Sequence, residues 1–259
     1  MMTITDRHQY ILQKLQENGR VDIQELSDAI QVSGVTIRKD LKLLEERNLL
    51  FRTRGGGSIV NPYAVEKPIN EKEFIKVEEK AKIARAALPF IEQTQSIIIG
   101  SGTTVFALSR CLHPTRHLTV ITPALKVALE LHNRNNIEVL QLGGLIHQSS
   151  ASAAGAFAMR ILDDIACDVL FLGVDGIDLE FGFSITNITE ASLNQKMIQI
   201  AQKVVIMADS SKFGRRGLGR ICAIEQVQYI ITDSGVPAGT VQQLEEKGIK
   251  VIIADNGNR

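Results

Sequence analysis

Short polar segments follow apolar stretches at several points in the carboxy-terminal two-thirds of this sequence. The first is the small-residue turn from Ser101 to Thr104, directly after the apolar stretch 97–99. If that turn opens a helix, its backbone amides and hydroxyl groups can hold an anion such as a phosphate. The turn could equally be an ordinary tight connection between a strand and a helix. It matches neither a dinucleotide-binding fingerprint nor a Walker loop.

Two later segments repeat the arrangement. Asp175 follows the apolar stretch 168–174, Lys212 comes shortly after 204–208, and Glu190 lies on the predicted helix between them. Single Asp residues in such places often cap turns or helices. Gathered at the carboxyl ends of parallel strands, however, these side chains would suit a phosphorylated sugar or polyol. The lysine would bind the phosphate and the carboxylates would bind hydroxyl groups.

The alternation of apolar stretches with helical patterns from about residue 73 onward predicts a doubly wound, mostly parallel sheet. The predicted strands are residues 96–100, 118–122, 139–142, 168–174, 204–208, 229–232 and 251–254. The predicted helices are residues 73–91, with a break near Pro89, and residues 105–111, 124–132, 190–202 and 240–247.

The first 60 residues have a different pattern, with apolar residues at steps of three or four that predict three short helices. The second helix is expected to start behind Asp22 and the third behind Ser33, after a tight turn that is typical of a helix-turn-helix. The Gly-rich turn 55–57 between two apolar stretches predicts a β-hairpin that would form a wing. Residues 61–72 carry two prolines among polar residues and are expected to form a linker.

The predicted third helix could enter a major groove of DNA, because its outward face near the N-terminus is polar and basic. From residue 34 to residue 58 there are six basic and three acidic residues, a charge of +3 in a chain whose 29 basic and 29 acidic residues balance as a whole. Such charges could instead merely solvate a helix face, and some winged helices bind proteins. The candidate DNA-binding residues are Ser33, Val35, Thr36, Arg38, Lys39, Lys42, Arg52 and Arg54.

Composition narrows the class of protein. With 44% hydrophobic and 22% charged residues, the chain is expected to be globular. Its three cysteines form no CxxC pair, so neither a structural zinc site nor a disulfide framework is expected. No apolar run approaches the roughly 18 residues of a membrane span and no leader precedes the first helix, which predicts a cytoplasmic protein.

The motifs resemble those of a known family. Residues 32–41 (VSGVTIRKDL), followed by Leu44, Glu45 and residues 52–56 (RTRGG), resemble the DNA-binding signature of the DeoR family of bacterial transcriptional regulators. Residues 171–178 and 209–213 continue the resemblance, which is strongest to repressors of amino-sugar and hexitol operons and covers nearly the whole chain.

The resemblance implies a mostly α N-terminal winged helix-turn-helix joined to a C-terminal α/β domain. The second domain would be a doubly wound, mostly parallel sheet resembling sugar-phosphate isomerases. The implied boundaries are residues 1–60 for DNA binding, 61–72 for the linker, and 73–259 for effector sensing and oligomerisation.

The implied function is repression of a carbohydrate operon. The protein would be a homodimer or homotetramer that binds a double-stranded DNA operator and a sugar phosphate. No cofactor, metal or catalytic activity is implied. The implied effector-binding residues are Ser101, Gly102, Thr103, Thr104, Asp175, Gly176, Glu190, Ser211 and Lys212. The alternative is a sugar-phosphate isomerase-like enzyme with a fused DNA-binding module, in which Asp175 or Glu190 would act as general base.

Three positions depart from the family pattern. Gly100 stands where an Asp commonly precedes the turn, Pro123 replaces an Asn, and His147 with Gln148 replaces a basic pair. Because these changes remove a carboxylate, an amide and positive charge, the resemblance does not name the effector. His147 is expected to be an ordinary surface histidine rather than a charged substitute.

Overall fold

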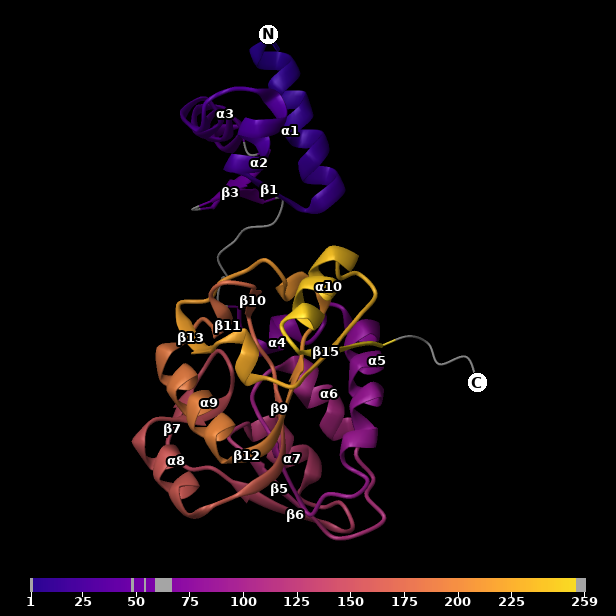
Figure 1. Cartoon of the computed structure of the whole chain (residues 1–259). Helices are drawn as coiled ribbons and strands as arrows, with labels where there is room; N and C mark the ends of the chain where they lie inside the picture. The colour runs from indigo at the N-terminus through magenta and orange to yellow at the C-terminus, as the bar shows by residue number, and fades with distance from the viewer. Residues whose placement is uncertain (1, 48, 54, 59–66, 255–259) are drawn as a thin grey trace. The chain divides into compact units, whose positions relative to one another are not determined.

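The computed structural model describes residues 2–47, 49–53, 55–58 and 67–254 (Figure 1). The chain divides into two units, Met1–Ala64 and Val65–Arg259, each with its own hydrophobic core. Within the described ranges, no helix is long and apolar enough to cross a membrane.

The first unit contains three helices and a small antiparallel sheet. The elements are α1 (Ile4–Asn18), β1 (Arg20–Asp22), α2 (Ile23–Ile30), α3 (Gly34–Glu46), β2 (Phe51–Arg52) and β3 (Gly56–Ser58). The strand order is β1-β3-β2, so the predicted hairpin is confirmed, although Gly56 and Gly57, which were expected in its turn, belong to β3. Strand β1 was not predicted, because three residues were too few to reveal it.

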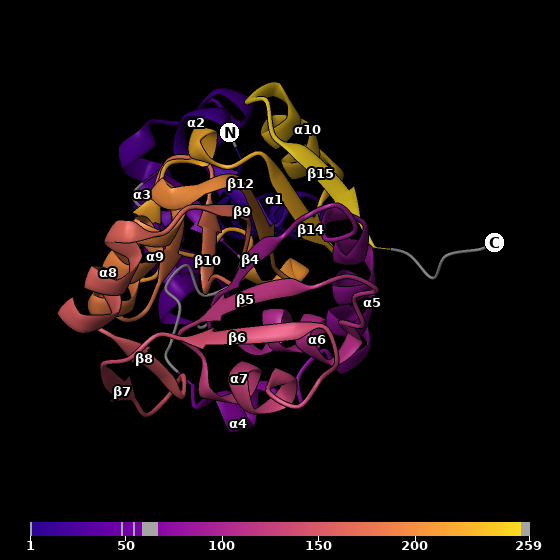
Figure 2. The same ribbon diagram turned by 90° about the horizontal axis from the view of Figure 1, so that it is seen from below.

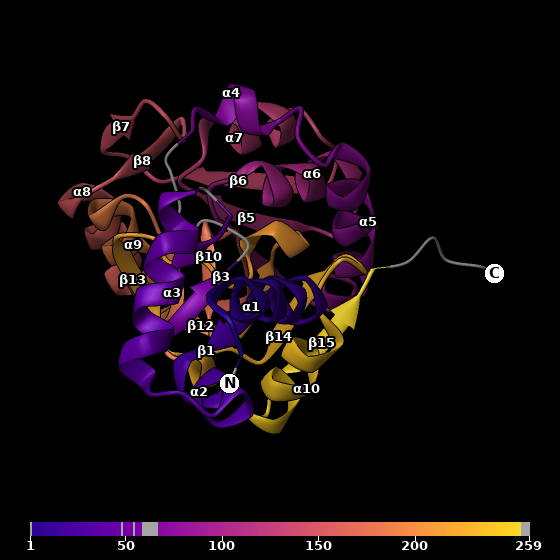
Figure 3. The ribbon, with the colours of Figure 1, turned by 90° about the horizontal axis from the view of Figure 1, so that it is seen from above.

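Apolar spacing and N-caps explain the helices of the first unit. Ile11 and Leu15 on α1 pack with Ile37 and Leu41 on α3, and α1 and α3 contact each other (Figure 3). The Asp22 carboxylate accepts hydrogen bonds from the backbone amides of residues 24 and 25 at the start of α2, as its position predicted. These contacts fix which face of α3 is left to solvent.

The second unit is built on a seven-stranded, wholly parallel sheet, which confirms all seven predicted strands. Its strands are β4 (Ser96–Ile99), β5 (Leu118–Thr122), β6 (Ile137–Gln141), β9 (Cys167–Leu172), β12 (Ala201–Met207), β14 (Tyr229–Thr232) and β15 (Lys250–Ile253). The order is β15-β14-β12-β9-β4-β5-β6. The chain builds outward from β4 in one direction and then from β9 in the other, so the topological switch point lies between β4 and β9.

Helices cover both faces of this sheet (Figure 2). One face carries α5 (Val77–Ala87), α6 (Thr103–Cys111) and α7 (Leu125–Leu131). The other carries α8 (Ala156–Ile161), α9 (Ile188–Ile200) and α10 (Ala238–Glu246). Successive residues of a central strand, such as Ile97 and Ile98 of β4, belong to opposite clusters. Such a strand is apolar on both sides and appears as a continuous apolar stretch in the sequence.

Several short elements were not predicted. They are the hairpin β7 (Leu145–His147) and β8 (Ser152–Ala154), and the antiparallel sheet of β10 (Gly176–Asp178), β11 (Gly182–Ile185) and β13 (Gly219–Cys222). Short 3-10 turns are η1 (Leu88–Phe90), η2 (Leu162–Asp164), η3 (Ser210–Lys212) and η4 (Ile224–Gln226). The single helix predicted over 73–91 is shorter: α5 runs from Val77 to Ala87, and η1, which contains Pro89, begins at Leu88.

The segment expected to be a linker is partly structured. Residues 61–66 lie outside the described residues, whereas α4 (Ile69–Lys72) is a short helix of the second unit. Its first amide, on Ile69, donates to the carbonyl of Ser149 at 2.6 Å. The end of the expected linker is therefore held against the rest of the second unit.

Candidate DNA-binding surface and effector pocket

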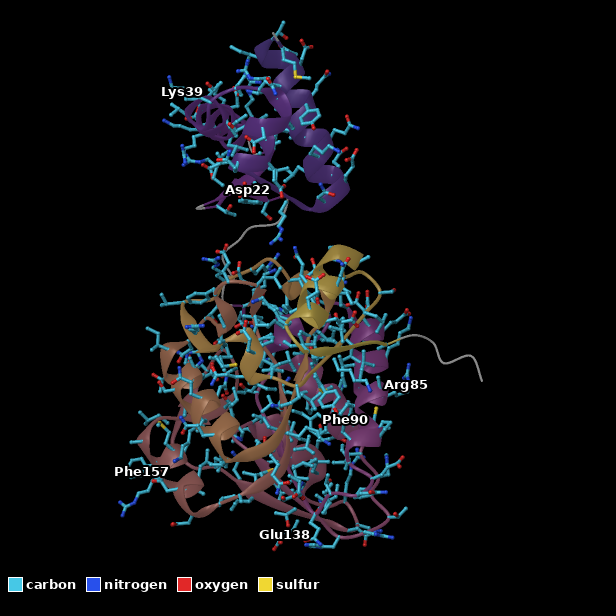
Figure 4. The ribbon with its side chains drawn as sticks, viewed as in Figure 1. Asp22, Lys39, Arg85, Phe90, Glu138 and Phe157 are labelled. Atoms are coloured by element: carbon cyan, nitrogen blue, oxygen red, sulfur yellow. The ribbon has the colours of Figure 1, made fainter. Side chains whose placement is uncertain are left out.

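The outward face of α3 carries the predicted DNA-binding side chains. Val35 is 60% exposed, and Arg38 and Lys39 are exposed as well, while Ile37 and Leu41 are buried. Figure 4 labels Lys39 at the outer edge of the first unit. Neither Arg38 nor Lys39 forms an ion pair with a residue in the described part of the chain, so both charges are available to a partner.

The remaining predicted residues have mixed surroundings. Ser33 caps α3 by accepting the amide of Thr36, and the two hydroxyl groups lie 3.0 Å apart. Lys42 is exposed and lies 3.8 Å from Glu46. Arg52 is exposed on β2, where its guanidinium lies 3.7 Å from Glu45; Arg54 lies outside the described residues. Ser33 therefore caps the helix, whereas Lys42 and Arg52 keep exposed charged groups.

A buried ion pair that the sequence did not predict positions α3. Asp40, on its inner face, accepts two hydrogen bonds from the guanidinium of Arg7 on α1, at 2.8 and 3.0 Å. His8 contacts the same carboxylate at 3.2 Å. The hydrogen bond to Asp40 raises the pKa of Arg7. The basic and acidic residues were visible in the sequence, but their separation of 33 positions gave no sign of contact.

The second unit has a pocket at the carboxyl ends of the adjacent strands β4, β9 and β12, at the switch point of the sheet. Seven of the nine predicted effector-binding residues line it. These seven are Ser101, Gly102, Thr103, Thr104, Asp175, Glu190 and Lys212. Further lining residues that the sequence did not indicate are Ile69, Lys72, Ser149, Ser150, Gly173, Val174, Ile185 and Thr186.

The turn before α6 presents backbone amides to this pocket. Gly102 has φ +119°, a conformation that side-chain-bearing residues rarely adopt, and it is the N-cap of α6. No side chain caps this helix, which leaves its first amides available to a ligand. The turn is thus suited to the anion that the sequence predicted.

Lys212 and Asp175 provide the pocket's opposite charges. Lys212 makes no side-chain hydrogen bond or ion pair with any residue in the described ranges, and burial lowers its pKa despite the opposing effect of Asp175. Burial tends to raise the pKa of Asp175, but the nearby Lys72 and Lys212 outweigh it and the pKa is lowered. Asp175 is therefore ionised at neutral pH and can accept hydrogen bonds from hydroxyl groups.

Glu190 forms the other acidic wall. It is 4% exposed on α9 and accepts hydrogen bonds from the hydroxyls of Ser150 and Ser152. The expectation of an ordinary surface histidine at 147 is wrong: the imidazole lies 3.7 Å from Glu190 and 2.8 Å from the amide nitrogen of Asn187. The β7–β8 hairpin brings these groups together, and that hairpin had not been predicted.

Two predicted residues do not line the pocket. Gly176 pairs with β11, and a Cβ there would lie 2.5 Å from the carbonyl oxygen of Arg215, so glycine is required for close backbone packing. The hydroxyl of Ser211 donates to Asp209 within η3. Both residues shape the loops that carry Asp175 and Lys212.

Gly100 and Pro123, which differ from the family pattern, both make close contacts within the fold. Gly100 is buried at the end of β4, and a Cβ there would lie 2.9 Å from Leu172 Cδ1. The carbonyl of Pro123 accepts the amide of Ala153 at 2.8 Å and so ties the β7–β8 hairpin to the sheet. Neither residue lines the pocket.

Comparison with known proteins places both units. Residues 7–62 match the DeoR-like helix-turn-helix domain and residues 75–234 match the DeoR C-terminal sensor domain. A relative from Escherichia coli O157:H7, named as a transcriptional repressor of the aga operon, is 35% identical over 96% of this chain and 93% of its own. The glycerol-3-phosphate regulon repressor of Escherichia coli K12 is 28% identical over 96% of this chain and 99% of its own.

Among solved structures, ribose 5-phosphate isomerase A from Neisseria gonorrhoeae is similar in part, with 18% identity and a TM-score of 0.37 over 52% of each chain. The two domain matches cover most of the sequence in the order that the fold shows. This chain belongs to the DeoR family of transcriptional regulators.

Proposed function

We propose that this protein represses a carbohydrate-utilisation operon and that a phosphorylated sugar or a related metabolite controls it from the pocket of the second unit. An anionic effector is supported mainly by one observation: Lys212 lies in the same pocket as the uncapped N-terminus of α6. Its ammonium has no side-chain partner in the described ranges. Both features attract an anion. The names of the two relatives agree with such a role.

The opposite wall of the pocket suits the rest of such a ligand. Asp175 and Glu190 line the same pocket and offer carboxylate oxygens to sugar hydroxyl groups. The proposal therefore gives the phosphate to Lys212 and the α6 turn, and the polyol to the carboxylates. It assigns no catalytic role to either acid.

On the DNA side, the proposal gives base contacts to Thr36 and Lys39 and backbone contacts to Arg52 and Arg54. A homodimer or homotetramer would bring two such helices to half-sites about one helical turn apart. The first 60 residues would carry this task, and the residues from 73 onward would carry effector binding and assembly. The protein would act in the cytoplasm, where its operator lies.

The test titrates the full-length chain with sugar phosphates and with the same sugars unphosphorylated, by calorimetry. Phosphorylated ligands should bind the wild type, and Lys212→Ala should weaken their binding about ten- to a hundredfold by removing a charge-assisted contact. Lys247→Ala, which removes a surface ion pair with Glu225, is the matched control. Equal affinity for phosphorylated and unphosphorylated sugars would contradict the proposal.

The same ligands should also change operator affinity, since an effector acts only through a difference in its affinity for two states. A coupling of about 1–3 kcal/mol corresponds to a change of roughly 5- to 150-fold. Conversion between aldose and ketose phosphates by the purified protein would favour the enzyme alternative instead.

A further inference from the structure

Residues 68–76, here called the strap, run across the effector pocket immediately after the segment that leads from the DNA-binding unit. The strap is fastened at three places. Its Ile69 amide donates to Ser149, its Lys72 binds Asp175, and its Lys76 ammonium lies 3.1 Å from the hydroxyl of Ser210. These three partners belong to three different loops at the carboxyl end of the sheet.

Helix α5 also holds the strap in place, through Lys80. Lys80 on α5 is 6% exposed, and its ammonium donates to the carbonyls of Lys72 and Ile75, each at 2.6 Å. Lys76 has φ +52°, an uncommon conformation for a residue with a side chain, where the strap turns into α5. The path of the strap is therefore fixed by several contacts that all depend on the sensor fold.

Lys72 is the point at which the strap enters the pocket. Its ammonium lies 2.8 Å from Asp175 Oδ1, and its side chain is 23% exposed. Both Lys72 and Lys212 line the pocket beside the Ser101–Thr104 turn, and both lower the pKa of Asp175.

Two lysines, Lys72 and Lys212, line this pocket together. The positive charge of Lys72 lowers the pKa of Lys212, and both lysines lower the pKa of Lys80. Asp175 is the carboxylate that directly meets Lys72 among the described residues. A dianionic group between Lys72 and Lys212 would relieve this repulsion.

We propose that Lys72 is a second phosphate-binding residue of the effector pocket, so that the effector is held jointly by the sensor fold and by the strap. The inference rests on the proposed function, because it requires an anionic effector. On binding, the Lys72 ammonium turns from Asp175 to the phosphate, and the released carboxylate accepts a ligand hydroxyl. The effector thereby changes a contact made by the chain segment that continues to the DNA-binding unit, which is the differential contact that allosteric control requires.

The experiment measures the affinity of the full-length protein for inorganic phosphate and for D-fructose 6-phosphate by calorimetry. Lys72→Met keeps the apolar stem and removes the charge, and it should weaken binding of both probes about tenfold or more, as Lys212→Met does. Lys72→Arg should restore most of the affinity. Lys196→Met, which removes a lysine paired with Asp163 outside the pocket, should leave affinity unchanged.

A double variant separates direct contact from an indirect effect of the unpaired carboxylate. Lys72→Met combined with Asp175→Asn removes one positive and one negative charge. If Lys72 touches the phosphate, the double variant should still bind inorganic phosphate more weakly than the wild type does. Recovery to wild-type phosphate affinity in the double variant would overturn the inference. Hydrogen exchange of the strap amides should slow with inorganic phosphate in the wild type and not in Lys72→Met.

The outcomes also separate this inference from the proposed function. If Lys212→Met loses phosphate binding and Lys72→Met does not, the strap contact is wrong and the effector class stands. If the wild type binds neither inorganic phosphate nor any sugar phosphate, both fail together.

Discussion

Arg7 and Asp40 join α1 to α3 through a bidentate ion pair whose side chains are only 10% and 4% exposed. The pair lies on the inner face of the helix whose outer face carries the candidate base contacts. The orientation of that outer face therefore depends on a charge pair as well as on apolar packing.

Asp40→Ala should lower the free energy of unfolding of the first unit by about 3–5 kcal/mol, because it leaves the Arg7 guanidinium buried without its partner. Urea denaturation of the full-length chain measures this loss. Glu17→Gln, which breaks a solvent-screened ion pair between Lys14 and Glu17 on α1, is the matched control and should lower stability far less. Equal effects of the two substitutions would show that burial does not govern the Arg7–Asp40 pair.

Arg52→Ala should weaken binding to all DNA sequences alike and reduce the magnitude of the salt slope by about one, because the wing is expected to contact phosphates. The measurement is a titration of operator and of unrelated DNA at several salt concentrations. Lys14→Ala removes the same charge from an exposed position on α1 and serves as control. An unchanged slope would remove Arg52 from the interface.

The sheet could be predicted from the sequence because its central strands, such as β4 and β9, are buried on both faces and form nearly continuous apolar stretches. The short strands β10, β11 and β13 gave no such signal, because three or four residues rich in glycine do not establish a period. The pocket could be predicted in part for the same reason, since Asp175 and Lys212 follow long strands.

What the sequence could not reveal were contacts between distant segments. Lys72 stands 103 positions from Asp175, among polar residues and prolines that are typical of a linker. His147 reached the acidic wall through an unpredicted hairpin. The spacing of nearby residues in the sequence predicts helices and strands, whereas these contacts depend on how the helices and strands pack together.

Lys80 should make stability depend on pH in the alkaline range. Burial lowers its pKa from 10.5 to about 8, so between these values the unfolded chain binds more protons at this position than the folded chain. Stability contributed by Lys80 therefore rises as the pH increases from about 8 toward 10, by at most about 1.4 kcal/mol per pH unit.

The check compares the wild type with Lys80→Met by urea denaturation at pH 7.0, 8.0 and 9.5. The difference in free energy of unfolding should shift in favour of the wild type by about 1–2 kcal/mol across this range. Parallel pH profiles for the two proteins would show that Lys80 keeps an ordinary pKa in the folded state.

Gly100→Asp tests whether the carboxylate that the family commonly has at this position could be restored. A Cβ at Gly100 would lie 2.9 Å from Leu172 Cδ1 and 3.4 Å from the Phe171 carbonyl oxygen, in a fully buried environment. The substitution should therefore lower the free energy of unfolding by about 1–3 kcal/mol through overpacking, with a further cost for a buried carboxylate. It should not strengthen binding of a sugar phosphate, because Gly100 does not line the pocket.

The same substitution at Gly143 is the control, because that glycine is exposed and a Cβ there would meet no atom within 4 Å. Gly143→Asp should change stability by less than about 1 kcal/mol. Calorimetry with D-fructose 6-phosphate on both variants completes the test. A stable Gly100→Asp protein that binds the ligand more tightly than the wild type would mean that the end of β4 can open toward the pocket. Packing of Leu172 against Gly100 would then leave room for a carboxylate.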